Sequence, residues 1–349
     1  MAQKKFCVGI DIGASRIKVC QLDEDKRGLF LQQYGQSILP PGAIVDGVIS
    51  DPNPIIDTLR KLKATHKLRN TKAAISVSGH QVIIKKITVP KMSQGELETN
   101  IKWEAEQYIP FDIEEVELDF HVVSDSASQK GHMDVILVAV KKDYLEDYTS
   151  IITEVGFEPM VCDVDSFAIE NMFLANYETP PGETVALVNV GATKTNINIL
   201  TDGVSNFTRD LSVGGDTFTE EIQKQLSITA GEAEILKLGV GDASADVPQE
   251  VRDCVQGIAD NITSELQRSI DFYSATSADA PPAHIYLTGG SARLEALEQS
   301  IKSRMWVHVT EINPFHKIIT DQHEPDFIST HAPSAGVAVG LALRFPGDS

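Results

Sequence analysis

Two short segments of this chain repeat one pattern of apolar residues, glycine and a hydroxyl side chain. The first is Val8-Gly-Ile-Asp-Ile-Gly-Ala-Ser15 and the second is Ala186-Leu-Val-Asn-Val-Gly-Ala-Thr193. Gly13 aligns with Gly191, an offset of 178 residues (191 minus 13). A repeat at this separation indicates either a duplicated structural unit or a chance similarity between two glycine hairpins.

The residues that follow each segment favour duplication. Two more apolar strands come next, at 17–22 and 29–34 in the first copy and at 197–200 and 204–211 in the second. An amphipathic helix then follows, over 51–62 in the first copy and from about Asp216 in the second. The sequence therefore predicts an α/β fold with a βββα unit used twice, in which two similar lobes face each other across a ligand cleft.

Two insertions interrupt the repeat. Residues 81–160 have a strand–helix–strand–strand–helix order of their own, and residues 219–275 are mostly helical. The expected first-lobe core is 1–80 with 161–184 and 334–349, and the expected second-lobe core is 185–218 with 276–333.

The charge of the chain limits its partners. Lysine and arginine total 30 against 50 aspartates and glutamates, a formal net charge of −20. Long-range repulsion argues against nucleic acid as a partner, and no apolar run reaches the roughly 18–20 residues of a membrane span. The four cysteines are scattered and lack zinc-ligand spacing. We expect a cytoplasmic protein that binds no nucleic acid and does not insert directly into a membrane.

The two glycine hairpins are candidate phosphate sites. A glycine lets backbone N–H groups approach an anion because no Cβ intervenes, and successive N–H groups form an anion-binding concavity. The residues expected to do this are Gly13, Ala14 and Ser15 in the first hairpin, and Gly191, Ala192 and Thr193 in the second. Lys18 would neutralise phosphate charge. Asp11 would hold Mg²⁺ through water, since magnesium keeps several of its waters. The alternative for either hairpin alone is an ordinary tight turn with a solvated aspartate.

Three more pairs of residues fit the same cleft: Gly289–Gly290, Gly214–Gly215 and Glu234–Lys237. The first pair follows an apolar strand and leaves room for a flat base. The second opens the second-lobe helix near the cleft. The third shares a helix face at a spacing of three, where it would pinch a ribose or base, and a surface ion pair is its alternative.

In this order the five motifs resemble those of the actin-like ATPase superfamily, whose fold is two-lobed and ribonuclease H-like. Within its FtsA-like branch, the chain is similar over nearly its whole length to the PilM family of type IV pilus assembly proteins. Segments typical of that family are Trp103-Glu-Ala-Glu-Gln-Tyr-Ile-Pro-Phe111, Phe218-Thr-Glu-Glu-Ile-Gln223 and Asn313-Pro-Phe315. The resemblance implies ATP or ADP with Mg²⁺ as the cofactor, and it adds Ser291 and Arg293 to the expected nucleotide contacts. It also implies that 81–160 is the extra subdomain characteristic of FtsA and PilM.

One position departs from the superfamily pattern. The second phosphate motif usually holds an aspartate that binds the metal–water network and positions the attacking water, and this chain has Asn189 there. Asparagine keeps hydrogen-bonding capacity but loses the charge and the basicity. We therefore expect nucleotide binding with weak or absent hydrolysis, and we assign no catalytic residue.

The resemblance also implies a partner. PilM proteins are cytoplasmic scaffolds, peripheral to the inner membrane, that bind the cytoplasmic N-terminal tail of the membrane protein PilN. The family's peptide groove lies between the first lobe and the inserted subdomain, which places it near Val82, Ile84, Trp103 and Tyr108. Core packing is the alternative role for Trp103. Other pilus inner-membrane or motor components are further possible partners.

Two other functions fit the same fold. A filament-forming cytoskeletal protein would need head-to-tail surfaces that a sequence does not reveal. A small-molecule kinase would need a carboxylate base in the cleft, and Asn189 removes the usual one.

Overall fold

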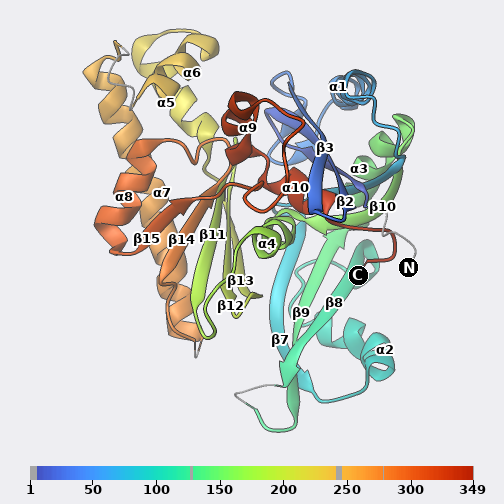
Figure 1. Ribbon diagram of the computed structural model, residues 1–349. Coiled ribbons are helices and arrows are strands. Elements are labelled where there is room, and N and C mark those ends of the chain that lie inside the picture. Colours follow the sequence, from blue (N-terminus) through green and yellow to red (C-terminus); the bar gives the residue numbers. More distant parts are fainter. Residues whose placement is uncertain (1–5, 126–128, 241–245, 278, 349) are drawn as a thin grey trace.

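The protein has two lobes that face each other, with connecting helices between them (Figure 1). The computed structural model describes residues 6–125, 129–240, 246–277 and 279–348. Each lobe is built on a five-stranded sheet, and a separate three-stranded sheet extends from the first lobe.

The first-lobe sheet has the strand order β10-β6-β1-β2-β3. Its strands are β1 (Val8–Ile12), β2 (Arg16–Asp25), β3 (Gly28–Ile38), β6 (Lys72–Val77) and β10 (Glu158–Val164). The first three form an antiparallel meander, and β6 and β10 add in parallel. Helices α1 (Pro52–Thr65) and α3 (Lys142–Glu154) cover one face, and a small hairpin of β4 (Ile44–Val45) and β5 (Val48–Ile49) lies beside them.

The second-lobe sheet repeats this arrangement in the order β15-β14-β11-β12-β13. Its strands are β11 (Thr184–Val190), β12 (Thr195–Thr201), β13 (Val204–Leu211), β14 (His284–Thr288) and β15 (His308–Glu311). Again three strands form a meander and two add in parallel. The predicted duplication is therefore confirmed. The helices of this lobe are α5 (Gly215–Leu226), α6 (Ala230–Gly239), α7 (Gln249–Thr276) and α8 (Glu295–Met305).

Strand β1 is buried on both faces, and its two faces differ. Val8, Ile10 and Ile12 point into the core under α1 and α3. Gly9 points the other way, where an added Cβ would lie 2.2 Å from the carbonyl oxygen of Ala338. Only a residue without a side chain admits a helix backbone this close to the strand.

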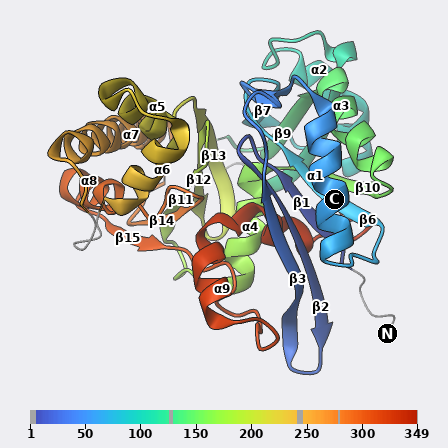
Figure 2. The ribbon, with the colours of Figure 1, turned by 90° about the horizontal axis from the view of Figure 1, so that it is seen from above.

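Two connecting helices lie between the lobes and share one core with both sheets. They are α4 (Asp165–Asn176) and α10 (Gly336–Ala342), and α9 (Pro325–His331) with the short turn η2 (Ala332–Ser334) leads into α10 (Figure 2). At Gly340 an added Cβ would lie 1.7 Å from Ala168 O, so the two helices are in backbone contact. Because this core takes residues from both sheets, it fixes how the lobes face each other.

The inserted segment forms a sheet of order β7-β9-β8 with one helix packed on it. Its elements are β7 (Val82–Pro90), α2 (Gln94–Ala105), η1 (Ile113–Glu115), β8 (Val116–Asp125) and β9 (His132–Lys141). A capping box at Ser93 opens α2, with reciprocal hydrogen bonds between Ser93 and Glu96. Helix α3, which follows β9, packs instead in the first-lobe core through Tyr144 and Tyr148. In the described ranges, no helix is both long and apolar enough to cross a membrane.

Candidate functional site

The first glycine hairpin joins β1 to β2 and is closed by a backbone hydrogen bond of 3.1 Å from Gly13 N to Arg16 O. Asp11 and Lys18 lie opposite each other on the two strands, and their side chains form an ion pair of 2.7 Å. Both groups are largely buried, with side-chain exposures of 12% and 14%. An added Cβ on Gly13 would lie 3.7 Å from Asp11 Oδ1 and 3.8 Å from Lys18 Nζ, so this glycine lies directly against the ion pair.

The second glycine hairpin joins β11 to β12 with the same backbone geometry. Gly191 N donates to Lys194 O at 2.9 Å. At the positions equivalent to the ion pair stand Asn189 and Asn196, again opposite each other, and Asn189 Nδ2 donates to Asn196 Oδ1 at 2.8 Å. The second lobe therefore replaces a charged pair with a neutral amide pair.

The start of α5 packs directly on the second hairpin. The amides of Gly215 and Asp216 donate to Gly191 O and Ala192 O, each at 2.8 Å. A Cβ on Gly214 would lie 2.5 Å from Ala192 O, which explains why glycine stands there. The expected pair Gly214–Gly215 thus supports the turn that holds the candidate phosphate amides.

Glu234 and Lys237 on α6 form a half-buried ion pair, because Lys237 is buried whereas the Glu234 side chain is 42% exposed. Lys237 is only 5% exposed, and its ammonium contacts Glu234 at 2.6 Å, Thr219 Oγ1 at 3.1 Å and Gly215 O at 3.3 Å. Thr219 also donates to Glu234 at 2.8 Å. This network ties α6 to the start of α5, beside the second hairpin.

The glycine turn after β14 reaches the same place. Gly289 has φ +99, and a Cβ there would lie 2.4 Å from Val190 O and 2.6 Å from Asn189 Oδ1. Ser291 N donates to Val190 O at 3.2 Å. Gly290 is exposed, with open space where a Cβ would project. Gly289 and Ser291 therefore lie against the second hairpin.

Arg293 makes different contacts. Its guanidinium pairs with Glu311 on β15 at 3.8 Å and donates to Ser329 O on α9. Neither Glu311 nor Ser329 belongs to a glycine hairpin.

A polar chain runs from the second hairpin to the first lobe. Asn196 Nδ2 donates to Asp210 Oδ1 at 2.7 Å, and Asp210 Oδ2 accepts from the backbone N–H of Gly79 at 2.8 Å. Asn189 joins this series of hydrogen bonds by donating to Asn196. Burial raises the pKa of Asp210, and the hydrogen bond from Asn196 opposes that shift.

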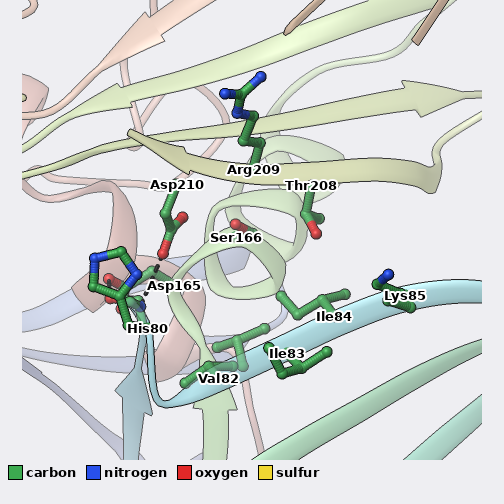
Figure 3. Close-up of a pocket in the computed structure, with 13 residues that line it drawn as sticks. His80, Val82, Ile83, Ile84, Lys85, Asp165, Ser166, Thr208, Arg209 and Asp210 are labelled. Carbon is green, nitrogen blue, oxygen red and sulfur yellow. Dashed lines mark hydrogen bonds between the residues drawn. The ribbon is translucent and has the colours of Figure 1, made fainter. Parts of the chain in front are cut away.

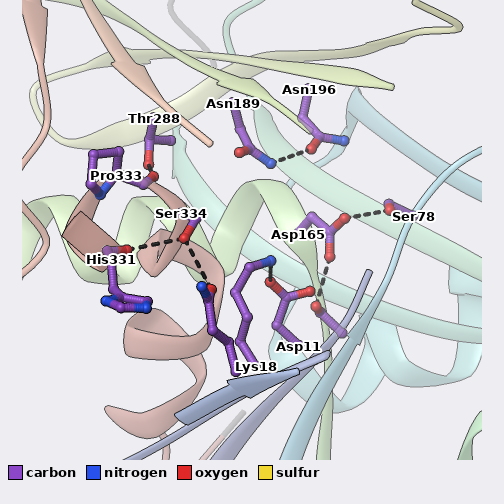
Figure 4. A network of polar contacts seen from close by, with 12 residues as sticks. Asp11, Lys18, Ser78, Asp165, Asn189, Asn196, Thr288, His331, Pro333 and Ser334 are labelled. Atoms are coloured by element: carbon purple, nitrogen blue, oxygen red, sulfur yellow. Dashed lines mark hydrogen bonds and ion pairs between the residues drawn. The ribbon is translucent and has the colours of Figure 1, made fainter. Parts of the chain in front are cut away.

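Lys194 makes a second bridge between the lobes. Its ammonium donates to Ser78 Oγ at 2.7 Å, and Ser78 in turn donates to Asp165 at the start of α4. Burial raises the pKa of Asp11, while Lys18 and, more weakly, Lys194 act against that rise. Ser78 follows β6, which pairs with β1, so this bridge brings the second hairpin beside the first, and Figure 4 shows both pairs with Asp165 between them.

The arrangement suits magnesium better than a metal held by protein ligands alone. In the part of the chain that the structure describes, no three His, Cys, Asp or Glu side chains gather closely enough to hold a metal ion. Magnesium commonly uses one or two carboxylates together with water and phosphate oxygens. A single carboxylate such as Asp11, beside the backbone amides at the hairpin tip, fits that requirement.

A cavity of about 260 Å³ lies next to these bridges (Figure 3). It is lined by the loop that follows β6, the start of β7, the start of α4 and the end of β13. Val82 and Ile84, expected in a peptide groove, are among its lining residues. Strands β7 and β13 are both at the edges of their sheets, so the cavity separates two strand edges.

The other two residues expected in the groove lie elsewhere. Trp103 is 71% exposed and Tyr108 is 36% exposed, and neither lines this cavity. The inner face of α2 packs on the inserted sheet through Leu97, Ile101 and Ala105. Core packing therefore does not account for Trp103.

Sequence reasoning missed several residues of this region, namely Ser78, Asp165, Lys194, Asn196 and Asp210. Two of these residues could have been identified from the internal repeat. The offset of 178 aligns Asn196 with Lys18 and Lys194 with Arg16, so a longer alignment of the two copies would have included them. The others depend on contacts between lobes.

Comparisons with known proteins agree on one family. A family model described as "Type IV pilus assembly protein PilM" matches residues 9–345. A solved structure titled "PilM-PilN type IV pilus biogenesis complex" has a TM-score of 0.87 and 26% identity, covering 98% of this chain and 98% of that chain.

Two more distant comparisons extend this likeness. The cell division protein FtsA of Streptococcus pneumoniae serotype 2 (strain D39 / NCTC 7466) is 26% identical over 270 residues, 70% of this chain, and the match spans 57% of the length of FtsA. MreB5 of Spiroplasma citri bound to ADP has a TM-score of 0.54 at 12% identity, covering 96% of this chain and 94% of that one, which shows the shared fold.

Proposed function

Because the chain belongs to the PilM family of type IV pilus assembly proteins, we propose that it is an ATP-binding scaffold that holds the cytoplasmic N-terminal tail of PilN. It would act in the cytoplasm, attached to the inner membrane through that partner. The observation that carries the proposal is the likeness, over 98% of both chains, to a PilM solved in complex with PilN.

The cavity between β7 and β13 is the place proposed for the peptide. Among the described strands, β7 pairs only with β9 and β13 only with β12, so each has one edge available for another strand. An extended peptide gains main-chain hydrogen bonds at such an edge and specificity from pockets for alternate side chains. Val82 and Ile84 offer an apolar wall for those side chains.

The nucleotide half of the proposal uses both hairpins. A magnesium–nucleotide complex supplies a compact polyanion that two sets of backbone amides can bind. The amides of Gly13 and Gly191 close their hairpins, so the amides of Ala14 and Ser15, and those of Ala192 and Thr193, would hold the phosphates. Lys18 would balance the phosphate charge, and Asp11 would orient a magnesium water. Gly290 and Ser291 would border the base, and Glu234 with Lys237 would border the sugar.

Hydrolysis would be slow or absent in this scheme. Asn189 donates its amide hydrogen to Asn196 and has no basic atom with which to take a proton from water. Nucleotide would then serve to set the relation between the lobes, and turnover would not be its main role.

Calorimetric titration with a synthetic PilN N-terminal peptide tests the peptide site. The double variant Val82→Ser with Ile84→Ser removes apolar contact area from the cavity wall, and we expect about a tenfold or greater loss of peptide affinity. Trp103→Ser is the matched control, because Trp103 lies outside the cavity, and it should change affinity by less than about twofold. If Trp103→Ser weakens peptide binding more than the double variant does, and circular dichroism shows that both are folded, the peptide groove lies at α2 instead.

A further inference from the structure

Lys194 belongs to the second lobe, but its side chain contacts residues of the first lobe. Its ammonium donates to Ser78 Oγ at 2.7 Å. It also lies 3.4 Å and 3.6 Å from the points where a Cβ would sit on Gly79 and Gly47. Both glycines have positive φ, +99 and +82, so each supplies a turn and the room that the lysine head needs.

The pocket that receives this ammonium is rich in carboxylates. Ser78 passes its own hydroxyl hydrogen to Asp165, which also accepts from Ser76 at 2.6 Å. Lys194 acts electrostatically on Asp11 and on Asp210. One lysine of the second hairpin thus lies among three acids drawn from β1, α4 and β13.

Lys194 contacts residues that line the cavity between β7 and β13, which is the proposed peptide site. Ser78, Gly79, Asp165 and Asp210 all line that cavity (Figure 3). The residue just before Lys194 is Thr193, one of the proposed phosphate contacts. Lys194 is therefore within one residue of the nucleotide site and in direct contact with the peptide site.

We propose that Lys194 is a phosphate ligand that also latches the lobes: without nucleotide it holds Ser78, and with nucleotide it turns to the phosphates and releases the cavity wall. The inference rests on the proposed function. A polyphosphate attracts an ammonium group far more strongly than a serine hydroxyl does, and the long stem of lysine lets its head move without the hairpin moving. The two sites are then coupled, and the coupling is reciprocal.

Hydrogen–deuterium exchange of the segment 78–84, with and without Mg·ATP, tests the latch without any peptide. In the unmodified protein we expect ATP to speed exchange in this segment. In Lys194→Met we expect fast exchange already without ATP, no further change on adding it, and about tenfold weaker ATP binding by calorimetry, since one charge-assisted contact is lost. Lys194→Arg should restore ATP binding in part.

Lys86→Met is the matched control. Lys86 also crosses between the lobes, donating to Asn206 Oδ1 at 2.9 Å, but it lies outside both hairpins and the cavity lining. It should leave the ATP response of the segment 78–84 unchanged.

The outcomes separate the latch from the function on which it rests. If ATP binds and the segment 78–84 does not respond, or if Lys194→Met responds like the unmodified protein, the latch is wrong and the scaffold proposal stands. If the unmodified protein binds no Mg·ATP, the nucleotide half of the proposed function fails and the latch fails with it.

Discussion

The two glycine hairpins have the same backbone and different side-chain pairs. Each is closed by a hydrogen bond from its glycine to the residue three positions later, and each presents one cross-strand pair beside that turn. In the first lobe the pair is Asp11 with Lys18 at 2.7 Å, and in the second it is Asn189 with Asn196 at 2.8 Å. Equivalent positions therefore hold a buried ion pair in one lobe and a neutral pair in the other.

This difference indicates that the two hairpins have different roles. A buried carboxylate can serve a metal and its waters, and it needs a nearby cation to remain charged. An amide pair holds no charge, but its remaining N–H groups can donate further hydrogen bonds. Asn196 donates to Asp210, which also accepts from the backbone N–H of Gly79 in the first lobe. We infer that the first hairpin supplies the electrostatics of the proposed nucleotide site and that the second hairpin connects this site to the other lobe.

The largest expected effect comes from removing the charge of the first pair. Asp11→Asn keeps the side-chain shape and makes the first hairpin resemble the second. We expect at least about a 100-fold loss of Mg·ATP affinity by calorimetry, because the metal loses its carboxylate and Lys18 loses its counter-charge. Asn189→Ala, which removes only neutral hydrogen bonds, should cost no more than about tenfold. Equal losses in the two variants would show that the hairpins do not divide the work in this way.

The next largest effect is expected when the charged Asp–Lys pair of the first hairpin is introduced at the equivalent positions of the second hairpin. Asn189→Asp sets a carboxylate against Asn196 Oδ1, and two acceptors facing each other should cost about 1–3 kcal/mol in the free energy of unfolding. Adding Asn196→Lys supplies an ammonium between the introduced carboxylate and Asp210, and we expect it to recover most of that loss. Urea denaturation of both variants measures this. If the single variant proves as stable as the parent, the amide pair is not required.

The smallest effect concerns how the connecting helices meet the two sheets. In the first lobe α10 meets β1 through backbone contact at Gly9, whereas in the second lobe Glu170 of α4 accepts from Asn198 on β12 at 3.2 Å. Burial raises the pKa of Glu170 from its ordinary 4.5 to about 7. The folded protein therefore holds this proton more tightly than the unfolded chain, so its contribution to stability is present below about pH 4.5 and is lost as the pH rises to about 7.

Glu170→Gln should remove that pH dependence. We expect the variant to be more stable than the parent at pH 8, by on the order of 2 kcal/mol, and to lack the fall in stability between about pH 4.5 and 7. Urea denaturation across this range measures both. Glu98→Gln, at an exposed position on α2, is the control and should follow the parent. A Glu170→Gln curve parallel to the parent's would mean that this carboxyl titrates normally.

Sequence alone predicted much of the fold, and it did so where the signal is local. The strand and helix periods and the offset between Gly13 and Gly191 gave the duplicated unit and both insertions. The segment Ser93-Gln-Gly-Glu96 is typical of a capping box, and it opens α2. Within each copy of the repeat, the strands and helices depend on residues a few positions apart, whose hydrogen bonds and side-chain directions are set by the chain itself.

The site was less predictable from sequence wherever it depends on neighbours distant in the chain. The spacing of Lys237 from Glu234 is equally typical of a surface ion pair, and Lys237 is buried because α6 packs on α5. Arg293 contacts Glu311 and Ser329 because β15 and α9 lie beside its turn. Nothing in the residues next to these positions specifies those partners.

What the sequence determined by itself is the shape of each half: two hairpins with small residues at their tips, each closed by a local hydrogen bond. What only the tertiary structure decided is which side chains meet between the halves, such as Lys194 with Ser78 and Asp210 with Gly79. The reason is physical. Those contacts exist only because α4 and α10 touch at Gly340 and set the spacing of the two sheets, and such long-range packing is a property of the whole core.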